Sequence, residues 1–385
     1  MLPTSDAGFG FGQDVTGGGS SQETVISNKD QLRNALRNLG PGTSLANVVL
    51  TLNDADYDFK GETEREFRIS AKNLTIRSGF GQRVTLKNLG LVLDLVRIDN
   101  ILIKGLAFHS DGDAEPNDAI LFDAEGQTEV DAGNLRSDVR ITRCTFDGYK
   151  DQAIEIRTRF SALLATIDNC YFFDSNPGQG DFVNRGAINV ASVIREDGRR
   201  TTANSFVTVA YNYFENVWRR SPRAASDGTR VHAFNNLLYR WGFQKDGFTE
   251  TPSWNGMPTE LNFHKANGDA VTAVIQANRF IPWAAKQNKA IDPDAGTQVD
   301  IGKSTSLANR FDMPNGKTGN TDLEKTVTKG NKFKTISVSD WYTNLGLKPP
   351  TVLPTGSVNW VTIARGAGPV NRGAVPDEID KDPGQ

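Results

Sequence analysis

The chain has 385 residues, and its 43 Lys and Arg against 46 Asp and Glu give a formal net charge of −3. A nucleic-acid binder held by a strongly basic face is therefore excluded, because counterion release needs many clustered cations. Only 3 His residues occur, which argues against a histidine-rich transition-metal centre, whereas the many carboxylates leave a hard-cation site open. No run of 18 apolar residues occurs, so we expect no membrane span.

The N-terminal part of the chain predicts an irregular entry followed by one helix. The start, MLPTSDAGFGFG, lacks the basic and apolar regions of a signal peptide, and a chain from which a signal had been removed would look the same. Residues 1–22 are rich in Gly and Ser and predict an irregular segment. Residues 28–36 predict a short amphipathic helix, capped by Asn28 or Ser27.

After this helix the helical period disappears and short β-like runs replace it. Most of these runs are at or just below the usual strand length of about five to six residues. They cover residues 48–52, 74–77, 84–86, 91–96, 101–103, 119–122, 139–142, 153–156, 166–167, 187–190, 207–210, 231–234 and 273–277.

Four of the β-like runs end in the same pattern, which is Cys or Asn, one further residue, and then Phe. The pattern occurs at 144–146, 170–172, 212–214 and 278–280, and a looser copy lies at 235–237. Such a repeat is typical of a solenoid, because one coil cannot bury its inward Ile, Val and Phe side chains alone, whereas stacked coils bury a continuous column. An Asn at the bend can hydrogen-bond along the column and tolerates left-handed backbone.

The repeat predicts an all-β fold, namely a right-handed, single-stranded parallel β-helix with a short N-terminal helix and long loops on one side. A β-sandwich or barrel is the alternative, but it should show regularly spaced two-residue hairpin turns, which are scarce here. We expect the β-helix to cover 23–365, between the entry segment 1–22 and a C-terminal tail at 366–385. Residues 286–335 are polar and loop-like and carry no functional signal.

The two cysteines, Cys144 and Cys170, occupy the same position of the repeat. Two cysteines are too few for a disulfide scaffold. We interpret them as small buried side chains stacked in adjacent coils, and a disulfide between them is the alternative.

Three acidic residues predict a metal site. Asp118 opens one β-like run, and Asp151 and Glu155 flank part of another. Positions i and i+4 of a strand share a face, so Asp151 and Glu155 both face outward if Asp151 leads into the strand, and Asp118 lies beside them from one coil earlier. Three hard oxygen donors on neighbouring coils suit Ca²⁺. Three solvated surface acids are the alternative.

A basic stretch and a histidine are the other chemical signals. The stretch 218–223, Trp-Arg-Arg-Ser-Pro-Arg, sets three guanidiniums beside an aromatic ring and suits a carboxylated partner, with a solvated basic turn as the alternative. His232 is a candidate base, but it alternates with Val231 and Ala233, which favours a structural role inside the coil.

Six motifs then follow one another in a fixed order, and together they cover residues from about 8 to 240 with the Gly-rich entry and the short helix. They are Asn100–Phe108, Asp118-Ala-Ile, Asp151-x-x-x-Glu155, Asn212-x-Phe214, Arg220-x-Pro222 and Val231–Asn236. In this order and spacing the chain resembles the pectate lyases, a family of right-handed parallel β-helix polysaccharide lyases.

The resemblance implies that Asp118, Asp151 and Glu155 bind Ca²⁺ and that Arg220 abstracts the proton at C5 of the substrate. The implied reaction is β-elimination on a 4-linked polyuronate such as polygalacturonate. Ca²⁺ would withdraw charge from the carboxylate next to C5 and stabilise the enolate-like transition state. Because arginine normally stays protonated, its role as a base implies an alkaline pH.

The chain departs from the family pattern at three places. Arg140–Arg143 replaces a Trp-Ile-Asp-His stretch, Pro177 stands where a substrate-binding Lys is expected, and Ala225 stands where a second Arg is expected. The residues that we expect to bind substrate in this chain are Arg223, Arg185, Arg230 and His232.

We therefore expect a secreted, monomeric, Ca²⁺-dependent lyase that binds an acidic polysaccharide, with insertions 111–136 and 174–204 as groove walls and with neither nucleic acid nor membrane as a partner. One alternative is a non-enzymatic carbohydrate-binding β-helix, such as an adhesin or tailspike-like module, and another is a lyase for a different uronate polymer. A glycoside hydrolase needs two carboxylates placed across a glycosidic bond, and Asp151 and Glu155 on one strand face suit a metal better.

Overall fold

The fold is known from a computed structural model, which describes most of the coils and both flanking segments. The described residues are 8–42, 45–53, 56–79, 83–111, 116–124, 136–159, 162–173, 186–192, 205–225, 228–242, 259–262, 271–283, 290–293, 297–302, 306–312, 335–368, 376 and 379. In this part of the chain the helices are α1 (Lys29–Asn38), α3 (Val338–Asn344), α4 (Trp360–Gly366) and the short 3₁₀ helix η2 (Thr355–Ser357). None of the described helices is long and apolar enough to cross a membrane.

The described strands form three parallel sheets, and each coil gives one strand to each sheet in turn. In spatial order, sheet A contains β1 (Glu23–Ile26), β2 (Ala46–Leu52), β5 (Lys72–Ser78), β8 (Asp99–Lys104), β11 (Arg136–Thr142), β14 (Ala162–Asp168), β17 (Ser205–Ala210), β20 (Arg230–Phe234), β23 (Thr272–Gln276) and β26 (Gln298–Asp300). Sheet B contains β3 (Asp56–Asp58), β6 (Val84–Lys87), β9 (Leu106–His109), β12 (Thr145–Asp147), β15 (Tyr171–Phe173), β18 (Tyr213–Glu215), β21 (Leu237–Trp241), β24 (Arg279–Pro282) and β27 (Arg310–Phe311). Sheet C contains β4 (Glu66–Ile69), β7 (Gly90–Asp94), β10 (Ile120–Asp123), β13 (Gln152–Thr158), β16 (Gly186–Ser192), β19 (Arg223–Ala225), β22 (Thr259–Asn262) and β25 (Ile291–Pro293).

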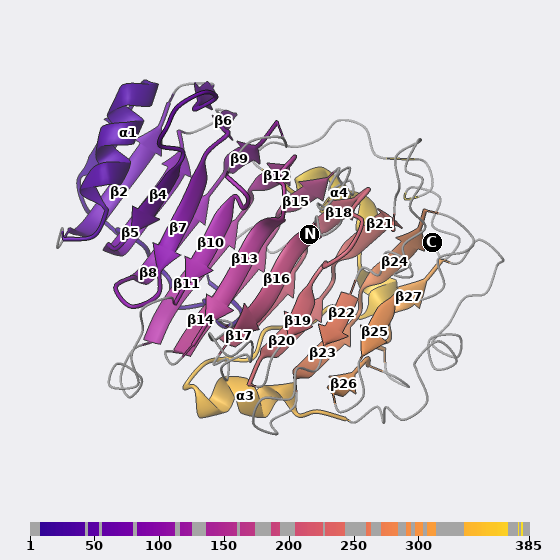
Figure 1. The fold of residues 1–385 in the computed structure, drawn as a ribbon. Coiled ribbons are helices and arrows are strands. Elements are labelled where there is room, and N and C mark those ends of the chain that lie inside the picture. The colour runs from indigo at the N-terminus through magenta and orange to yellow at the C-terminus, as the bar shows by residue number, and fades with distance from the viewer. Residues whose placement is uncertain are drawn as a thin grey trace, which may run out of the picture.

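This arrangement is a right-handed parallel β-helix, so the fold prediction is confirmed (Figure 1). Every β-like run of the sequence analysis overlaps one of these strands. The predicted N-terminal helix is α1, and the Asn28 side chain caps it by accepting a hydrogen bond from the backbone N–H of Gln31 at 2.9 Å. The long loops expected at 111–136 and 174–204 lie largely outside the described residues.

The repeated Phe side chains form a stack through the core. The ring centroids of Phe146 and Phe172 are 5.0 Å apart, and those of Phe172 and Phe214 are 4.9 Å apart, with the rings nearly parallel. Phe108 lies 5.1 Å from Phe146 on the other side. Each Phe therefore packs on its equivalent in the next coil, which is the packing that the repeat predicts for a solenoid.

The bend residues between sheets A and B form a hydrogen-bonded ladder. The backbone N–H of Asn212 donates to the Oδ1 atom of Asn236 at 3.0 Å, and the N–H of Asn236 donates to Oδ1 of Asn278 at 2.9 Å. The left-handed backbone lies one residue earlier than expected, at Tyr211 (φ 56°) and Ala277 (φ 53°). The ladder Asn therefore supplies the hydrogen bonds, and its neighbour makes the bend.

The two cysteines continue this ladder toward the N-terminus as free, buried thiols. The backbone N–H of Cys144 lies 3.4 Å from the Sγ atom of Cys170. Our interpretation of stacked, buried side chains is confirmed, and no disulfide joins them.

Segments outside the coils cover sheets A and B. The backbone of Phe11 and Gly12 donates hydrogen bonds to Thr208 and Thr166 on sheet A, and the ring of Tyr342 in α3 stacks on Phe11 with centroids 4.1 Å apart. Helix α4 packs its apolar side chains on a Tyr column of sheet B that contains Tyr171, Tyr213 and Tyr239. Within the described residues, no helix covers the outer face of sheet C from β7 onward, and this face fronts the view in Figure 1.

The C-terminal part differs from expectation. The sequence analysis missed α3 and α4, because each has only seven residues and is held by burying Tyr342 or Trp360 rather than by helix propensity. Strands β25 to β27 fall within the stretch 286–335 that looked loop-like. Ile379, in the expected tail, is buried beside α4. The domain limits themselves stay a prediction.

A buried ion pair holds the stretch that departs from the family pattern. Arg140 and Asp168 are both buried, and the guanidinium donates two hydrogen bonds to the carboxylate, at 2.9 and 3.2 Å. Thr142 and Asn169 donate two more to the same carboxylate, at 2.8 and 2.6 Å. The face of Phe9 lies 5.4 Å from the Arg140 guanidinium, so this pair also anchors the N-terminal segment.

Replacing one partner of this pair leaves a buried charge uncompensated. We expect Asp168→Ala to lower the free energy of unfolding by about 3–5 kcal/mol, measured by urea denaturation. The control is Asp30→Ala, which breaks the exposed pair between Asp30 and Arg33 and should cost less than about 1 kcal/mol. Similar losses in the two variants would contradict this assignment.

Candidate functional site

Strands β10 and β13 bring the three predicted acids together on the outer face of sheet C. Ile120 pairs with Ile154, so Asp118 and Asp151 both lie where the chain enters this sheet. Ile154 and Ile156 point into the core, which turns Glu155 outward. The backbone N–H of Gln152 donates to the Oδ1 atom of Asp118 at 2.9 Å and fixes that carboxylate.

The carboxylates of Asp118, Asp151 and Glu155 form one compact cluster. One oxygen of each lies within 4.8 Å of the others. Asp118 and Glu155 are buried, whereas the side chain of Asp151 is 38% exposed. Carboxylate oxygens with one open side are the donor set that Ca²⁺ prefers, so the residues present fit such an ion.

The electrostatics of the cluster favour a cation. Burial and the charges of Glu155 and Asp151 raise the pKa of Asp118 well above its usual value. Burial and Glu155 also raise the pKa of Asp151, although Arg220 opposes the shift. Three acids at close range therefore repel one another, and a cation among them would relieve that repulsion.

Two further residues hold Glu155, and the sequence analysis missed both. Arg157 donates from Nε to Glu155 Oε1 at 2.8 Å, and Asn189 donates from Nδ2 to the same oxygen at 3.3 Å. Burial opposes the charge of Arg157, but its hydrogen bond to Glu155 and the three acids outweigh that effect and raise its pKa. Arg157 was detectable, because it lies two residues after Glu155 and shares its face. Asn189 depends on the register of β13 and β16, for which the sequence carries no signal.

Arg220 lies beside the acids, three residues before Arg223 at the start of β19. It is buried, has a φ of 60°, and its Nη1 atom lies 3.5 Å from Asp151 Oδ1. Its side chain lies over Gly186, where an added Cβ would come within 2.7 Å of Arg220 Cβ and 2.6 Å of Gln152 Oε1. The N–H of Gly186 donates to the carbonyl of Asp151 at 2.9 Å. Gly186 thus joins Arg220 to the acid cluster.

The four predicted substrate-binding residues are divided between the sheets. On sheet C, Arg223 pairs with Asn189, and Asn189 pairs with Glu155. These three residues form one row across neighbouring strands, and Arg223 is partly exposed. Arg230 lies on sheet A, where its guanidinium lies 4.9 Å from the ring centroid of Phe206. Arg185 lies outside the described residues.

His232 is fully buried on sheet A. Its Nδ1 atom lies 3.0 Å from the hydroxyl of Tyr342, and its Nε2 atom lies 3.1 Å from Gln276 Nε2. Burial lowers its pKa to about 3. This placement fits the interpretation of His232 as a structural residue. It does not fit the expectation that His232 binds substrate, because the ring is covered and lies on sheet A.

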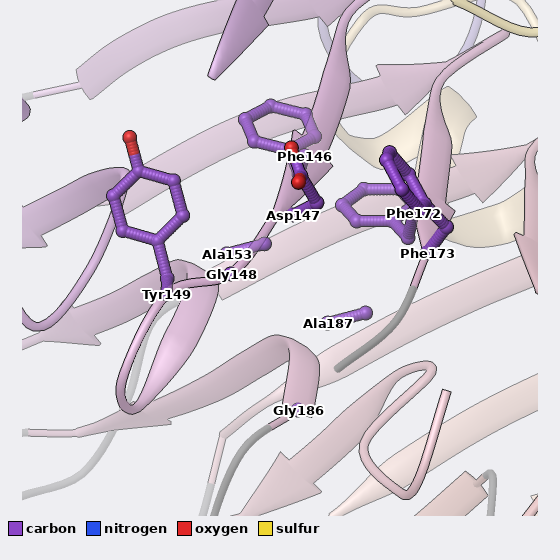
Figure 2. Close-up of a pocket in the computed structure, with 9 residues that line it drawn as sticks. All are labelled: Phe146, Asp147, Gly148, Tyr149, Ala153, Phe172, Phe173, Gly186 and Ala187. Atoms are coloured by element: carbon purple, nitrogen blue, oxygen red, sulfur yellow. The ribbon is translucent and has the colours of Figure 1, made fainter. Parts of the chain in front are cut away.

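A small cavity lies beside the site where the chain turns from sheet B into sheet C (Figure 2). It encloses about 240 Å³ of empty space, part of which is open to solvent. Its lining is mainly apolar: Phe146, Asp147, Gly148, Tyr149, Ala153, Phe172, Phe173, Gly186 and Ala187. Its enclosed part has room for about one water molecule, so we interpret it as a packing gap beside the site.

Comparison with known proteins identifies the family. The family model described as pectate lyase matches residues 3–280. The chain belongs to the pectate lyase family. No curated protein matches the sequence.

Solved structures, among them pectate lyases, share the fold at low identity. Jun a 1, the major allergen from cedar pollen, is 16% identical with a TM-score of 0.58, and the match covers 94% of this chain and 93% of that one. The thermostable pectate lyase PL 47 is 15% identical with a TM-score of 0.57, covering 96% and 98%. Pectate lyase II from Xanthomonas campestris is 16% identical with a TM-score of 0.51, covering 94% and 97%. At these identities the likeness shows the fold.

The raised pKa of Asp118 predicts a stability cost of the acid cluster in the absence of a cation. An acid whose pKa is raised by folding loses its proton more readily when unfolded, so stability falls as pH rises from about 3.9 through the folded value. We expect Asp118→Asn, which keeps an acceptor for Gln152, to raise the melting temperature at pH 7 with a chelator present. The gain should vanish at pH 3, and a lower melting temperature at pH 7 would contradict it.

Proposed function

We propose that the protein is a Ca²⁺-dependent polysaccharide lyase that cleaves a 4-linked polyuronate, most directly polygalacturonate, by β-elimination. The observation that carries the proposal is the contact of Arg220 with Asp151 inside a cluster of three carboxylates, with Nη1 3.5 Å from Oδ1. This arrangement sets a guanidinium next to a cation site on the face of the β-helix that no described helix covers.

Each residue then has a defined part in the reaction. Asp118, Asp151 and Glu155 would hold Ca²⁺, which would draw charge from the uronate carboxylate and so make the proton at C5 more acidic. Arg220 removes that proton as the base. The electron pair of the C5–H bond forms the C4–C5 double bond, and the bond from C4 to the glycosidic oxygen breaks. The leaving oxygen takes up a proton from water, which gives a new chain end and an unsaturated uronate, and Arg220 returns its proton to the solvent.

The substrate class rests on chemistry and on two neighbours. Guanidiniums form forked hydrogen bonds to carboxylates, and Arg220 and Arg223 both belong to the outer side of sheet C. A pectate lyase from Bacillus sp. N165, 14% identical with a TM-score of 0.50, was solved in complex with trigalacturonate. Another pectate lyase, 15% identical with a TM-score of 0.55, is described for its anti β-elimination mechanism. Secretion and a monomeric state complete the proposal and stay predictions.

The direct test is the ultraviolet absorbance of the unsaturated product formed from polygalacturonate. We expect an absorbance rise with Ca²⁺ that a chelator abolishes and that is larger at alkaline pH. Arg220→Ala should lower the turnover number by about 10²–10⁴-fold with little change in polymer binding. Arg230→Ala is the control. Although the sequence suggested Arg230 as a substrate-binding residue, its guanidinium lies on the ring of Phe206 on sheet A, so this variant should keep most activity.

Two outcomes would contradict the proposal. Glycan binding that survives Arg220→Ala, without an absorbance rise on any uronate polymer, would favour the non-enzymatic carbohydrate-binding β-helix. Products that lack the unsaturated ring would indicate hydrolysis instead.

The packing of Arg220 on Gly186 predicts a second kinetic effect. We expect the added methyl group of Gly186→Ala to displace the Arg220 side chain. The turnover number should then fall about 10²-fold, as for a 1 Å misplacement of a reacting group. Ca²⁺ affinity should change little, because the three atoms nearest to the added Cβ belong to Gln152 and Arg220 and none belongs to an acid. Gly356→Ala is the control, since no atom lies within 4 Å of its added Cβ. An unchanged turnover number in Gly186→Ala would contradict the proposal that packing on Gly186 positions Arg220.

A further inference from the structure

Asn189 is a buried polar residue on the outer side of the sheet that carries the acids. Its neighbours Ile188 and Val190 point into the core, so its side chain points outward from β16. It pairs with Glu155 on one side and with Arg223 on the other. Its exposed fraction is only 4%. Asn189 therefore lies between the acid cluster and the guanidinium of Arg223.

The hydrogen bonds of the Asn189 amide are incomplete. Its Nδ2 atom donates to Glu155 Oε1 at 3.3 Å, but its buried Oδ1 atom has no hydrogen-bond partner among the described residues. An unpaired buried acceptor costs about 1–3 kcal/mol, and such atoms in native structures call for an explanation. A carbonyl oxygen without a proton donor, on an amide that already contacts Glu155, is suited to a cation.

The contacts of Glu155 agree with this view. Both Arg157 and Asn189 donate to its Oε1 atom. No hydrogen bond to its Oε2 atom occurs in the described part of the chain, so that oxygen is available to a ligand. Asn189 therefore contacts one carboxylate of the cluster, in which one oxygen each of Asp118, Asp151 and Glu155 lies within 4.8 Å of the others.

We propose that Asn189 is a fourth protein oxygen ligand of the divalent cation held by the acid cluster. This inference rests on the proposed function, and it deepens the description of that site. Rotation about the Cβ–Cγ bond of Asn189 exchanges its amide nitrogen and oxygen, so the oxygen can face Glu155 where the nitrogen now lies. The separation of 3.3 Å between those atoms is below the sum of two Ca–O distances of 2.3–2.6 Å.

The amide then has two states with different partners. Without a cation, its N–H group donates to Glu155 and moderates the repulsion among the acids. With a cation, its carbonyl oxygen joins the ligand set, and the bond to the cation replaces the hydrogen bond from Nδ2 to Glu155. A set of four protein oxygens also favours Ca²⁺, which takes 6–8 oxygens, over Mg²⁺, which keeps several waters and requires near-ideal octahedral geometry.

The test is Ca²⁺ affinity measured by isothermal titration calorimetry on the full chain without substrate. We expect Asn189→Leu, which removes both amide atoms, to raise the dissociation constant by about tenfold. We expect Asn189→Asp, which keeps an oxygen and adds a charge, to lower it about three- to tenfold, because charge count tunes Ca²⁺ affinity. Melting temperatures with a chelator present show that each variant is folded.

A matched control separates a direct ligand from a general charge effect. Asn88 is also buried and also donates to a carboxylate, that of Asp58 at 3.0 Å, but on sheet B. Asn88→Asp should leave the dissociation constant for Ca²⁺ unchanged within about a factor of two.

The outcomes distinguish this inference from the proposed function. If Asn189→Asp weakens binding as much as Asn189→Leu, the amide only orients Glu155, and the inference is wrong while the acid site stands. An unchanged Ca²⁺ affinity in Asn189→Leu would also show that the inference about Asn189 is wrong while the acid site stands. If instead Glu155→Gln leaves Ca²⁺ affinity unchanged, the acid cluster is not the cation site, and the proposed function fails at that step.

Discussion

The in-register stacking of parallel strands is the constraint on which the rest of this structure depends. Each residue of a coil lies about 4.8 Å from its equivalent in the next, so any feature of one coil is repeated or opposed by its neighbours. Inward, this register stacks Phe146 on Phe172 and Phe214. Outward, it sets Glu155 beside Asn189 and Asn189 beside Arg223. The same strand register therefore determines both the packing of the core and the arrangement of the site.

The acid cluster weakens the fold that carries it, because burial and mutual repulsion raise the pKa of Asp118 and Asp151. Neighbouring interactions offset this cost. The Asn ladder pairs buried backbone N–H groups that a bend would otherwise leave without acceptors, and the Phe stack buries apolar area without a break. A solenoid thus tolerates three repelling carboxylates on one face, since the coils on either side are held independently of them.

The features that could be predicted from the sequence are those that depend on the residues of a single coil. The β-like runs, the bend Asn residues and the i, i+4 pair of Asp151 and Glu155 follow from local alternation and repeat. Three-residue strands such as β12 and β15 were missed, because they are too short to show a period. Alternation tells inward from outward but not which of three sheets a residue joins, so Arg230 and His232 were grouped with Arg220, although both lie on sheet A. Asn189 and Gly186 depend on register between coils.

The position of the candidate site follows from what covers the other two faces. On sheet A, Thr166 and Thr208 accept hydrogen bonds from the N-terminal segment, and Tyr342 covers His232. On sheet B, α4 covers the Tyr column. The polar and aromatic groups on those faces are thus already engaged with the chain itself. On sheet C, by contrast, no described helix covers the strands from β7 onward, and the buried Oδ1 atom of Asn189 beside Glu155 has no hydrogen-bond partner within the described residues. Sheet C is therefore the face that the described helices leave open, and the candidate site lies on it because the other two faces are covered by the chain itself.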